Sequence, residues 1–204
     1  MLAALRHLVR RTRYGPPIVV VSGLPRSGTS MMMKMLDAGG MPLVTDAARE
    51  ADEDNPRGYF EDERVKALDR TADRGWLRDC RGKAVKIISY LLKDLPDENF
   101  YQVVFMRRKL EEVVASQNKM LLRRGERADP SEDGATVERY TLHLRKVEFL
   151  LRESANFAAL DVDYREALAD PRGQARRVRS FLRRELDEDR MVAAVDPALY
   201  RNRR

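Results

Sequence analysis

An eight-residue stretch near the start of the chain has the glycine spacing of a phosphate-binding loop. It fits the pattern G-x-x-x-x-G-T-S and reads Gly23-Leu24-Pro25-Arg26-Ser27-Gly28-Thr29-Ser30. An apolar run at residues 16–23 leads into it, and residues 30–38 continue as an apolar helical segment. Such a loop curls its backbone N–H groups around an anion, and the next helix directs its positive end at the same point. The sequence therefore predicts an anion-binding loop.

The residue types within this loop indicate what kind of anion it binds. A nucleoside triphosphate hydrolase carries a lysine after the second glycine, which reaches the β- and γ-phosphates. Here Thr29 occupies that position and supplies no positive charge. Arg26 places the positive charge inside the loop instead, where its guanidinium can donate hydrogen bonds to one phosphate and to an adjacent group at the same time. We expect a site for a single phosphate and a transferring group.

The loop and a second pair of residues resemble the sulfotransferase family. The segment "PRSGTS" between a strand and a helix is similar to the 5′-phosphosulfate-binding loop of that family, particularly the P-R-S-G-T-T form of tyrosylprotein sulfotransferases. In the family, a strand ends in an arginine, a serine follows eight residues later, and both bind the 3′-phosphate of the donor. Arg108 and Ser116 in "VVFMRRKLEEVVASQ" have this separation, although alone they would be an ordinary arginine and a small helix residue. The resemblance covers residues 17–117.

The resemblance implies transfer of a sulfuryl group from 3′-phosphoadenosine 5′-phosphosulfate to a hydroxyl or amine. It also implies that the donor is bound by eight residues: Pro25, Arg26, Ser27, Gly28, Thr29, Ser30, Arg108 and Ser116. The positive charge of Arg26 would meet the oxygen that gains charge as the group moves. Lys86 is a further catalytic candidate, because cytosolic members carry a lysine near the sulfuryl group in a comparable K-T-H-L-P segment. A strand-edge lysine that reaches solvent is the alternative.

The catalytic base is the point at which the sequence departs from the cytosolic members. Their basic histidine would fall at Ile88, so the base lies elsewhere or the acceptor needs none. Other branches of the family use a glutamate from the segment after the first helix, here residues 45–65. A carboxylate there could accept the proton of the acceptor hydroxyl. We rank Glu61 first and Glu53 second, and Asp46 and Glu50 follow.

The pattern of apolar segments predicts the elements that position these residues. Continuously apolar strands are expected at 16–23, 82–91, 101–108 and 156–164, and helices at 30–38, 110–125, 135–154 and 170–186. Buried parallel strands joined by helices indicate an α/β fold: a three-layer, P-loop-like domain with a central parallel sheet of four or five strands and helices on both faces. The domain spans 1–204, with a basic segment at 1–14 and a mobile loop expected at 125–134.

Composition limits the remaining function classes. The chain has 204 residues, 43% of them hydrophobic, and no apolar run long enough to span a bilayer, so we expect a single cytoplasmic domain. One cysteine and two histidines favour reduced, metal-free chemistry. The net charge of +6 suits an anionic nucleotide donor, but 33 acidic residues interspersed with 39 basic ones argue against a nucleic-acid partner.

Several alternatives stay open. A P-loop nucleotide kinase or NTPase-like protein shares the fold, and the missing loop lysine argues against it. A non-catalytic nucleotide-binding protein would bind the product of the donor and transfer nothing. A basic interaction protein would bind polyanions in a strongly salt-dependent way. The acceptor can be a carbohydrate, a small hydroxylated metabolite, a lipid headgroup or a peptide tyrosine, and the oligomeric state is not predicted.

Overall fold

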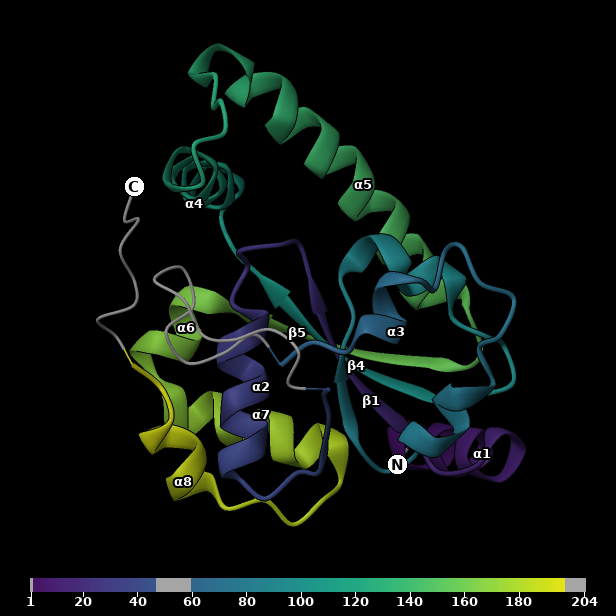
Figure 1. The fold of residues 1–204 in the computed structure, drawn as a ribbon. Coiled ribbons are helices and arrows are strands. Elements are labelled where there is room, and N and C mark those ends of the chain that lie inside the picture. The colour runs from purple at the N-terminus through teal and green to yellow at the C-terminus, as the bar shows by residue number, and fades with distance from the viewer. Residues whose placement is uncertain (1, 47–59, 197–204) are drawn as a thin grey trace.

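A single five-stranded parallel sheet organises the computed structural model, which describes residues 2–46 and 60–196 (Figure 1). The strand order is β2-β3-β1-β4-β5, and every neighbouring pair is parallel. The strands are β1 (Ile18–Gly23), β2 (Leu43–Val44), β3 (Ala84–Lys86), β4 (Tyr101–Arg107) and β5 (Phe157–Asp163). Helices cover both faces, so the predicted three-layer α/β fold with a parallel sheet is confirmed.

The central strand β1 is buried along its whole length. Val19 and Val21 pack in one apolar cluster with α2, α7 and α8, whereas Ile18 and Val20 pack in a second cluster on the opposite face. Because both faces are covered, the strand is continuously apolar instead of alternating. The strands β3 and β4 both come after β1 in the chain, and they pair with it on opposite sides in the sheet. The carboxyl end of β1 is therefore a topological switch point, where α/β sheets bind their ligands.

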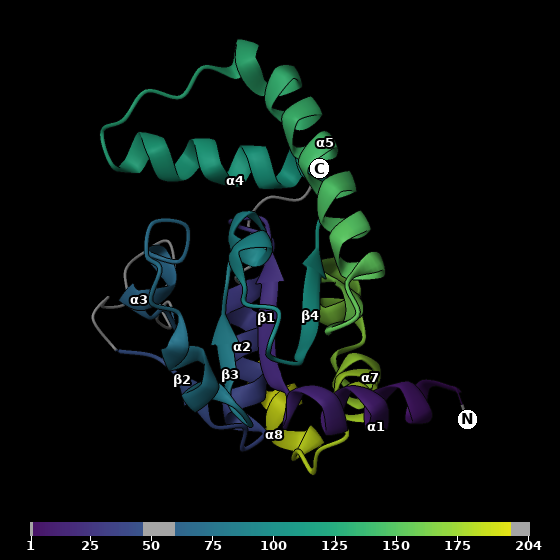
Figure 2. The ribbon, with the colours of Figure 1, turned by 90° about the vertical axis from the view of Figure 1, so that its right-hand side faces the viewer.

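The helices frame this edge of the sheet. In Figure 2, α4 lies beyond the carboxyl ends of the strands, α5 starts there and runs down beside the sheet, and α1 lies at the opposite end. The α-helices are α1 (Leu2–Tyr14), α2 (Thr29–Ala38), α3 (Glu63–Lys66), α4 (Leu110–Arg123), α5 (Asp133–Glu153), α6 (Tyr164–Ala169), α7 (Pro171–Leu182) and α8 (Glu188–Ala193). The 3₁₀ helices are η1 (Gly75–Cys80), η2 (Ser89–Asp94) and η3 (Pro130–Glu132).

Three local expectations differ from the structure. The strand expected at 82–91 ends at Lys86, and η2 follows it almost at once. The two-residue strand β2 was not placed by the sequence because it is too short to show a pattern. Part of the loop expected at 125–134 is helical, because the Asp129 side chain accepts a hydrogen bond from the Ser131 amide and Pro130 opens the turn. The mobility of that segment stays a prediction.

Candidate functional site

The loop predicted to bind an anion joins β1 to α2 at the switch point, and its shape depends on two glycines. A Cβ on Gly23 would lie 2.4 Å from Ser27 Oγ and 2.7 Å from the Met106 carbonyl oxygen. Gly28 has φ +103°, and a Cβ there would lie 2.4 Å from Cδ2 of Tyr164. Only glycine fits either position without displacing its neighbours. The loop is thus packed directly between β4 and the start of α6.

Arg26 and Ser27 provide polar groups within the loop. Arg26 has φ 70°, a left-handed conformation that costs a non-glycine residue about 1–2 kcal/mol. Such conformations cluster at functional sites. Ser27 Oγ is buried and has no hydrogen-bond partner within residues 2–46 and 60–196. Because the ten-residue helix α2 starts at Thr29, its positive end also lies at this loop. An unused hydroxyl, a cation and a helix N-terminus fit a bound phosphate.

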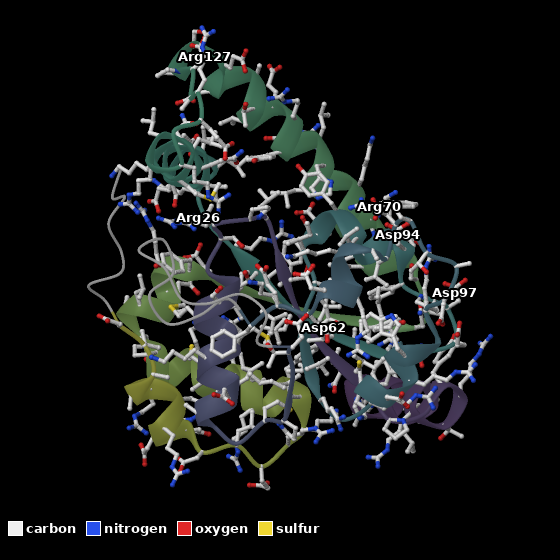
Figure 3. All side chains as sticks on the ribbon, in the orientation of Figure 1. Arg26, Asp62, Arg70, Asp94, Asp97 and Arg127 are labelled. Carbon is white, nitrogen blue, oxygen red and sulfur yellow. The ribbon has the colours of Figure 1, made fainter. Side chains whose placement is uncertain are left out.

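Arg26, Arg108 and Ser116 are brought together although they come from two different segments of the chain. Arg26 Nε donates to Ser116 Oγ at 3.1 Å, and Arg108 Nη1 donates to the Arg26 carbonyl oxygen, also at 3.1 Å. Ser116 is buried on α4, and the Arg108 side chain, just beyond β4, is 7% exposed. The two predicted phosphate-binding groups are therefore parts of one continuous cluster. Figure 3 places Arg26 beneath α4, far from the acidic Asp94 and Asp97.

Sequence reasoning missed three residues that complete this cluster. Glu112 on α4 is 0% exposed and forms ion pairs with Arg108 and Arg165. Tyr164, which packs against the loop at Gly28, also lies under the Arg108 guanidinium, 4.6 Å from ring centroid to Cζ. Glu112 could have been found, because it precedes Ser116 by four residues and so shares its helix face. Arg165 carries no such signal, since it follows β5, far along the chain.

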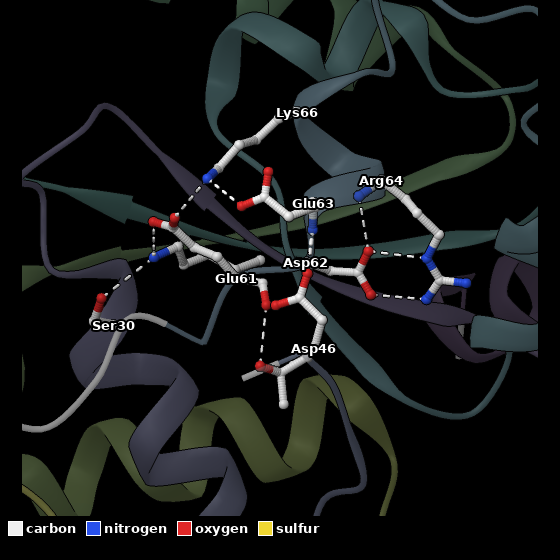
Figure 4. A network of polar contacts seen from close by, with 9 residues as sticks. Ser30, Asp46, Glu61, Asp62, Glu63, Arg64 and Lys66 are labelled. Atoms are coloured by element: carbon white, nitrogen blue, oxygen red, sulfur yellow. Dashed lines mark hydrogen bonds and ion pairs between the residues drawn. The ribbon is translucent and has the colours of Figure 1, made fainter. Parts of the chain in front are cut away.

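Lys86 and Glu61 form a second polar group beside the loop. Figure 4 shows the Glu61 side chain between Lys66 and Ser30. Lys86 Nζ lies 3.1 Å from Glu61 Oε1 and 3.5 Å from Ser30 Oγ. The Lys86 side chain is 7% exposed, so the alternative of a lysine that reaches solvent is wrong. Glu61 Oε2 is also 3.7 Å from Lys66 Nζ. The first-ranked base and the predicted catalytic lysine are thus direct partners.

Backbone contacts hold Glu61 in this place. The Thr45 hydroxyl and the Asp46 amide both donate to the Glu61 carbonyl oxygen, at 3.0 and 3.2 Å. The Asp46 carboxylate accepts a hydrogen bond of 2.6 Å from the Glu63 amide. Asp46 therefore has a structural role at the start of α3, which weakens its candidacy as a base. Glu53 and Glu50, the other ranked carboxylates, lie outside the described residues.

A histidine from another element lies beside the residue that follows Ile88, the position at which the basic histidine of the cytosolic sulfotransferases would fall. His143 on α5 is hydrogen-bonded through Nε2 to the buried Ser89 hydroxyl at 2.8 Å, and its ring stacks on Tyr90 at 3.8 Å. Burial lowers the pKa of His143, and the nearby Lys146 adds to the effect. Ser89 begins η2, three residues after Lys86, so this contact fixes η2 against α5.

A cavity of about 330 Å³ lies between α4 and α5, with Tyr90 in its wall. Asn118 Nδ2 donates to Asp133 Oδ1 at 2.8 Å within it, and the Tyr140 hydroxyl donates to the Gln117 side-chain oxygen. These polar groups are bonded to one another, so they do not define a ligand. Across residues 2–46 and 60–196, no three His, Cys, Asp or Glu side chains are placed to hold a metal ion. In the same part of the chain, no helix has the length and apolar character needed to cross a bilayer.

The fold is a P-loop-like α/β domain, and the loop with its neighbouring side chains forms a candidate anion site at the switch point of the sheet. Solved structures with this fold include the sulfotransferase domain of the Synechococcus PCC 7002 olefin synthase (TM-score 0.56, 16% identity, 91% of this chain and 86% of that one). A sulfotransferase from Alicyclobacillus acidocaldarius has a TM-score of 0.52 at 14% identity, with 90% and 87% covered. The sulfotransferase domain of the curacin biosynthetic pathway has a TM-score of 0.50 at 14% identity, with 89% and 78% covered.

No protein-family model matches the sequence, and no curated protein does. The three solved structures are all sulfotransferase domains, so the chain has the sulfotransferase fold over about nine-tenths of its length. The resemblance noted from the loop sequence is therefore confirmed at the level of the fold.

Proposed function

We propose that this protein transfers a sulfuryl group from 3′-phosphoadenosine 5′-phosphosulfate to a hydroxyl or amine of an acceptor. The observation that carries the proposal is the contact between the two predicted phosphate-binding groups. Arg26 in the loop bonds Ser116 on α4, and Arg108 bonds the backbone of Arg26. A donor with a phosphate at each of two ribose positions needs two such groups at neighbouring strand ends, and β1 and β4 are neighbours.

Each residue of the site has a role in this reaction. The amides of residues 26–30 and the loop hydroxyls, with the Arg26 side chain, bind the 5′-phosphosulfate, and Arg108 and Ser116 bind the 3′-phosphate. In the transfer, a bond forms between the acceptor oxygen and sulfur, and the bond from sulfur to the bridging oxygen breaks. Lys86, beside Ser30, stabilises the negative charge that develops on the bridging oxygen. Glu61 accepts the acceptor's proton.

The pairing of Lys86 with Glu61 suits both of these roles. The ion pair places Glu61, the proposed proton acceptor, directly beside the Lys86 ammonium group. It also keeps the ammonium group beside the loop, where the leaving oxygen would lie. The pair further explains how a buried lysine is tolerated next to the positive end of α2, because an opposite charge lies within hydrogen-bond distance.

Calorimetry with adenosine 3′,5′-bisphosphate, the product of the donor, tests the proposal. We expect the wild-type protein to bind it without added metal and to prefer it to ATP with Mg²⁺. Arg26→Ala should weaken binding, whereas Arg70→Ala, an exposed arginine paired with Asp69, should not. Preference for ATP would favour a kinase or NTPase. Binding without sulfuryl transfer to any acceptor class would indicate a non-catalytic nucleotide-binding protein, and salt-sensitive polyanion binding alone a basic interaction protein.

A further inference from the structure

We infer that Glu112 is a positioning residue that holds Arg108 and Arg165 together, and that Arg165 is a further binding residue for the 3′-phosphate. This inference rests on the proposed function and deepens it. It names the residues that make the site selective for a nucleotide with a second phosphate. The sequence motifs identified neither Glu112 nor Arg165. Glu112 lies one helix turn before Ser116, but its contact with Arg165 joins positions 53 residues apart in the chain.

The contacts of Glu112 divide its two oxygens between two cations. Oε2 accepts from Arg108 Nε at 3.0 Å, and Oε1 accepts from Arg165 Nε at 3.0 Å and lies 2.7 Å from Arg165 Nη2. Glu112 is 0% exposed, and a buried carboxylate is stable only when it is paired and hydrogen-bonded. One glutamate thereby sets the orientation of both guanidinium groups. It also offsets the repulsion between them.

Arg108 is fixed on further sides, whereas Arg165 is the more accessible of the two. Arg108 donates to the Arg26 carbonyl oxygen and lies over the Tyr164 ring. Its side chain is 7% exposed, and that of Arg165 is 38% exposed. An anion that arrives from solvent can therefore reach Arg165. Among the described residues, Arg26, Arg108, Arg165 and Glu112 together carry a net charge of +2, which matches a phosphate dianion.

The charge of Glu112 is needed for this arrangement, and its shape alone does not suffice. Glutamine at position 112 would keep one acceptor oxygen and replace the other with an NH₂ group. That group would face the N–H donors of Arg108 or Arg165, because a guanidinium has donors and no acceptor. One arginine would lose its partner and its fixed orientation. The affinity for a ligand without the 3′-phosphate should not depend on this change.

The experiment compares adenosine 3′,5′-bisphosphate with adenosine 5′-monophosphate by calorimetry on the full chain. Wild-type protein should bind the bisphosphate more tightly. The dissociation constant of the monophosphate divided by that of the bisphosphate measures the contribution of the second phosphate. In Glu112→Gln and in Arg165→Ala this ratio should fall about tenfold, the equivalent of one lost charge-assisted hydrogen bond. Affinity for the monophosphate should stay near the wild-type value, which also reports that the loop is folded.

Matched variants separate positioning from general damage. Glu111→Gln alters the exposed neighbour of Glu112 on the same helix and should leave the ratio unchanged. Glu112→Asp keeps the charge and should restore part of the selectivity. If Glu112→Gln does not fold, Arg165→Ala decides, because its side chain is partly exposed. An unchanged or increased ratio in Arg165→Ala, or in folded Glu112→Gln, overturns the inference while the proposed function stands. Failure of the wild-type protein to bind the bisphosphate removes both.

Discussion

The ion pair between Lys86 and Glu61 gives the sharpest prediction for catalysis. Glu61→Gln keeps the size of the side chain and removes the group that accepts the proton. Donor binding should be retained, because the residues proposed to contact the phosphates lie on the loop, at the end of β4 and on α4. Transfer should slow by about 10²–10⁴-fold, the usual range for loss of a general base. Lys86→Met, which removes the positive charge beside Ser30, should slow transfer without changing which group accepts the proton.

The structure also sets the expected effect of these changes on stability. Exposed ion pairs contribute about 0.2–1 kcal/mol, and loss of one partner from a fully buried pair costs about 3–5 kcal/mol. Lys86 is 7% exposed and Glu61 is 21% exposed, at a separation of 3.1 Å. We therefore expect Glu61→Gln to lower the free energy of unfolding by about 2 kcal/mol, between these two ranges. Lys86→Met should lower it less, because the carboxylate that it leaves behind, Glu61, is the more exposed partner and still lies 3.7 Å from Lys66 Nζ.

Single-turnover release of adenosine 3′,5′-bisphosphate from the donor measures the rate, with water as the acceptor until the natural acceptor is known. Urea unfolding of the same proteins measures stability. Glu63→Gln is the matched control. Glu63 lies two residues beyond Glu61, is exposed, and forms its ion pair with Lys66. A near-normal rate in Glu61→Gln would refute the assignment of the base and direct attention to Glu53 and Glu50.

Three further predictions concern the scaffold. Gly28→Ala should lower the melting temperature and abolish bisphosphate binding, because its Cβ would lie 2.4 Å from the Tyr164 ring. Gly134→Ala is the control, because a Cβ there meets open space, and equal melting temperatures of the two variants would contradict the argument. Burial lowers the pKa of His143 and of His7, so their contribution to the free energy of unfolding is complete above about pH 6.5 and falls at lower pH, where the unfolded chain takes up protons first. In urea titrations, His143→Asn should make the free energy of unfolding depend less on pH, and an unchanged pH dependence would disprove the contribution of His143. Burial raises the pKa of Cys80 to about 11, so iodoacetamide at pH 8 should label urea-unfolded protein and spare the native form; rapid native labelling would contradict this.

The sequence predicts those parts of the site that are local. The loop at 23–30 carries its geometry in its glycines, and the separation of Arg108 from Ser116 is set by one strand end and about two turns of helix. The partner of Lys86 could not be derived in this way. Glu61 was ranked first for its neighbours in sequence, but its contact with Lys86 depends on β3 and the segment before α3 meeting in space. Sequence patterns describe faces of elements, and they do not say which faces meet.

The contact between Arg26 and Ser116 connects the two halves of the proposed donor site energetically. These residues bond each other, yet each is expected to bind a different phosphate. A 5′-phosphate that draws the Arg26 guanidinium away from Ser116 leaves the serine hydroxyl for the other phosphate. A ligand with only one phosphate breaks the same hydrogen bond but gains contacts on one side alone. We therefore expect the cost of separating Arg26 from Ser116 to be offset best by a nucleotide that carries both groups, so that the loop itself contributes to the proposed selectivity for the bisphosphate.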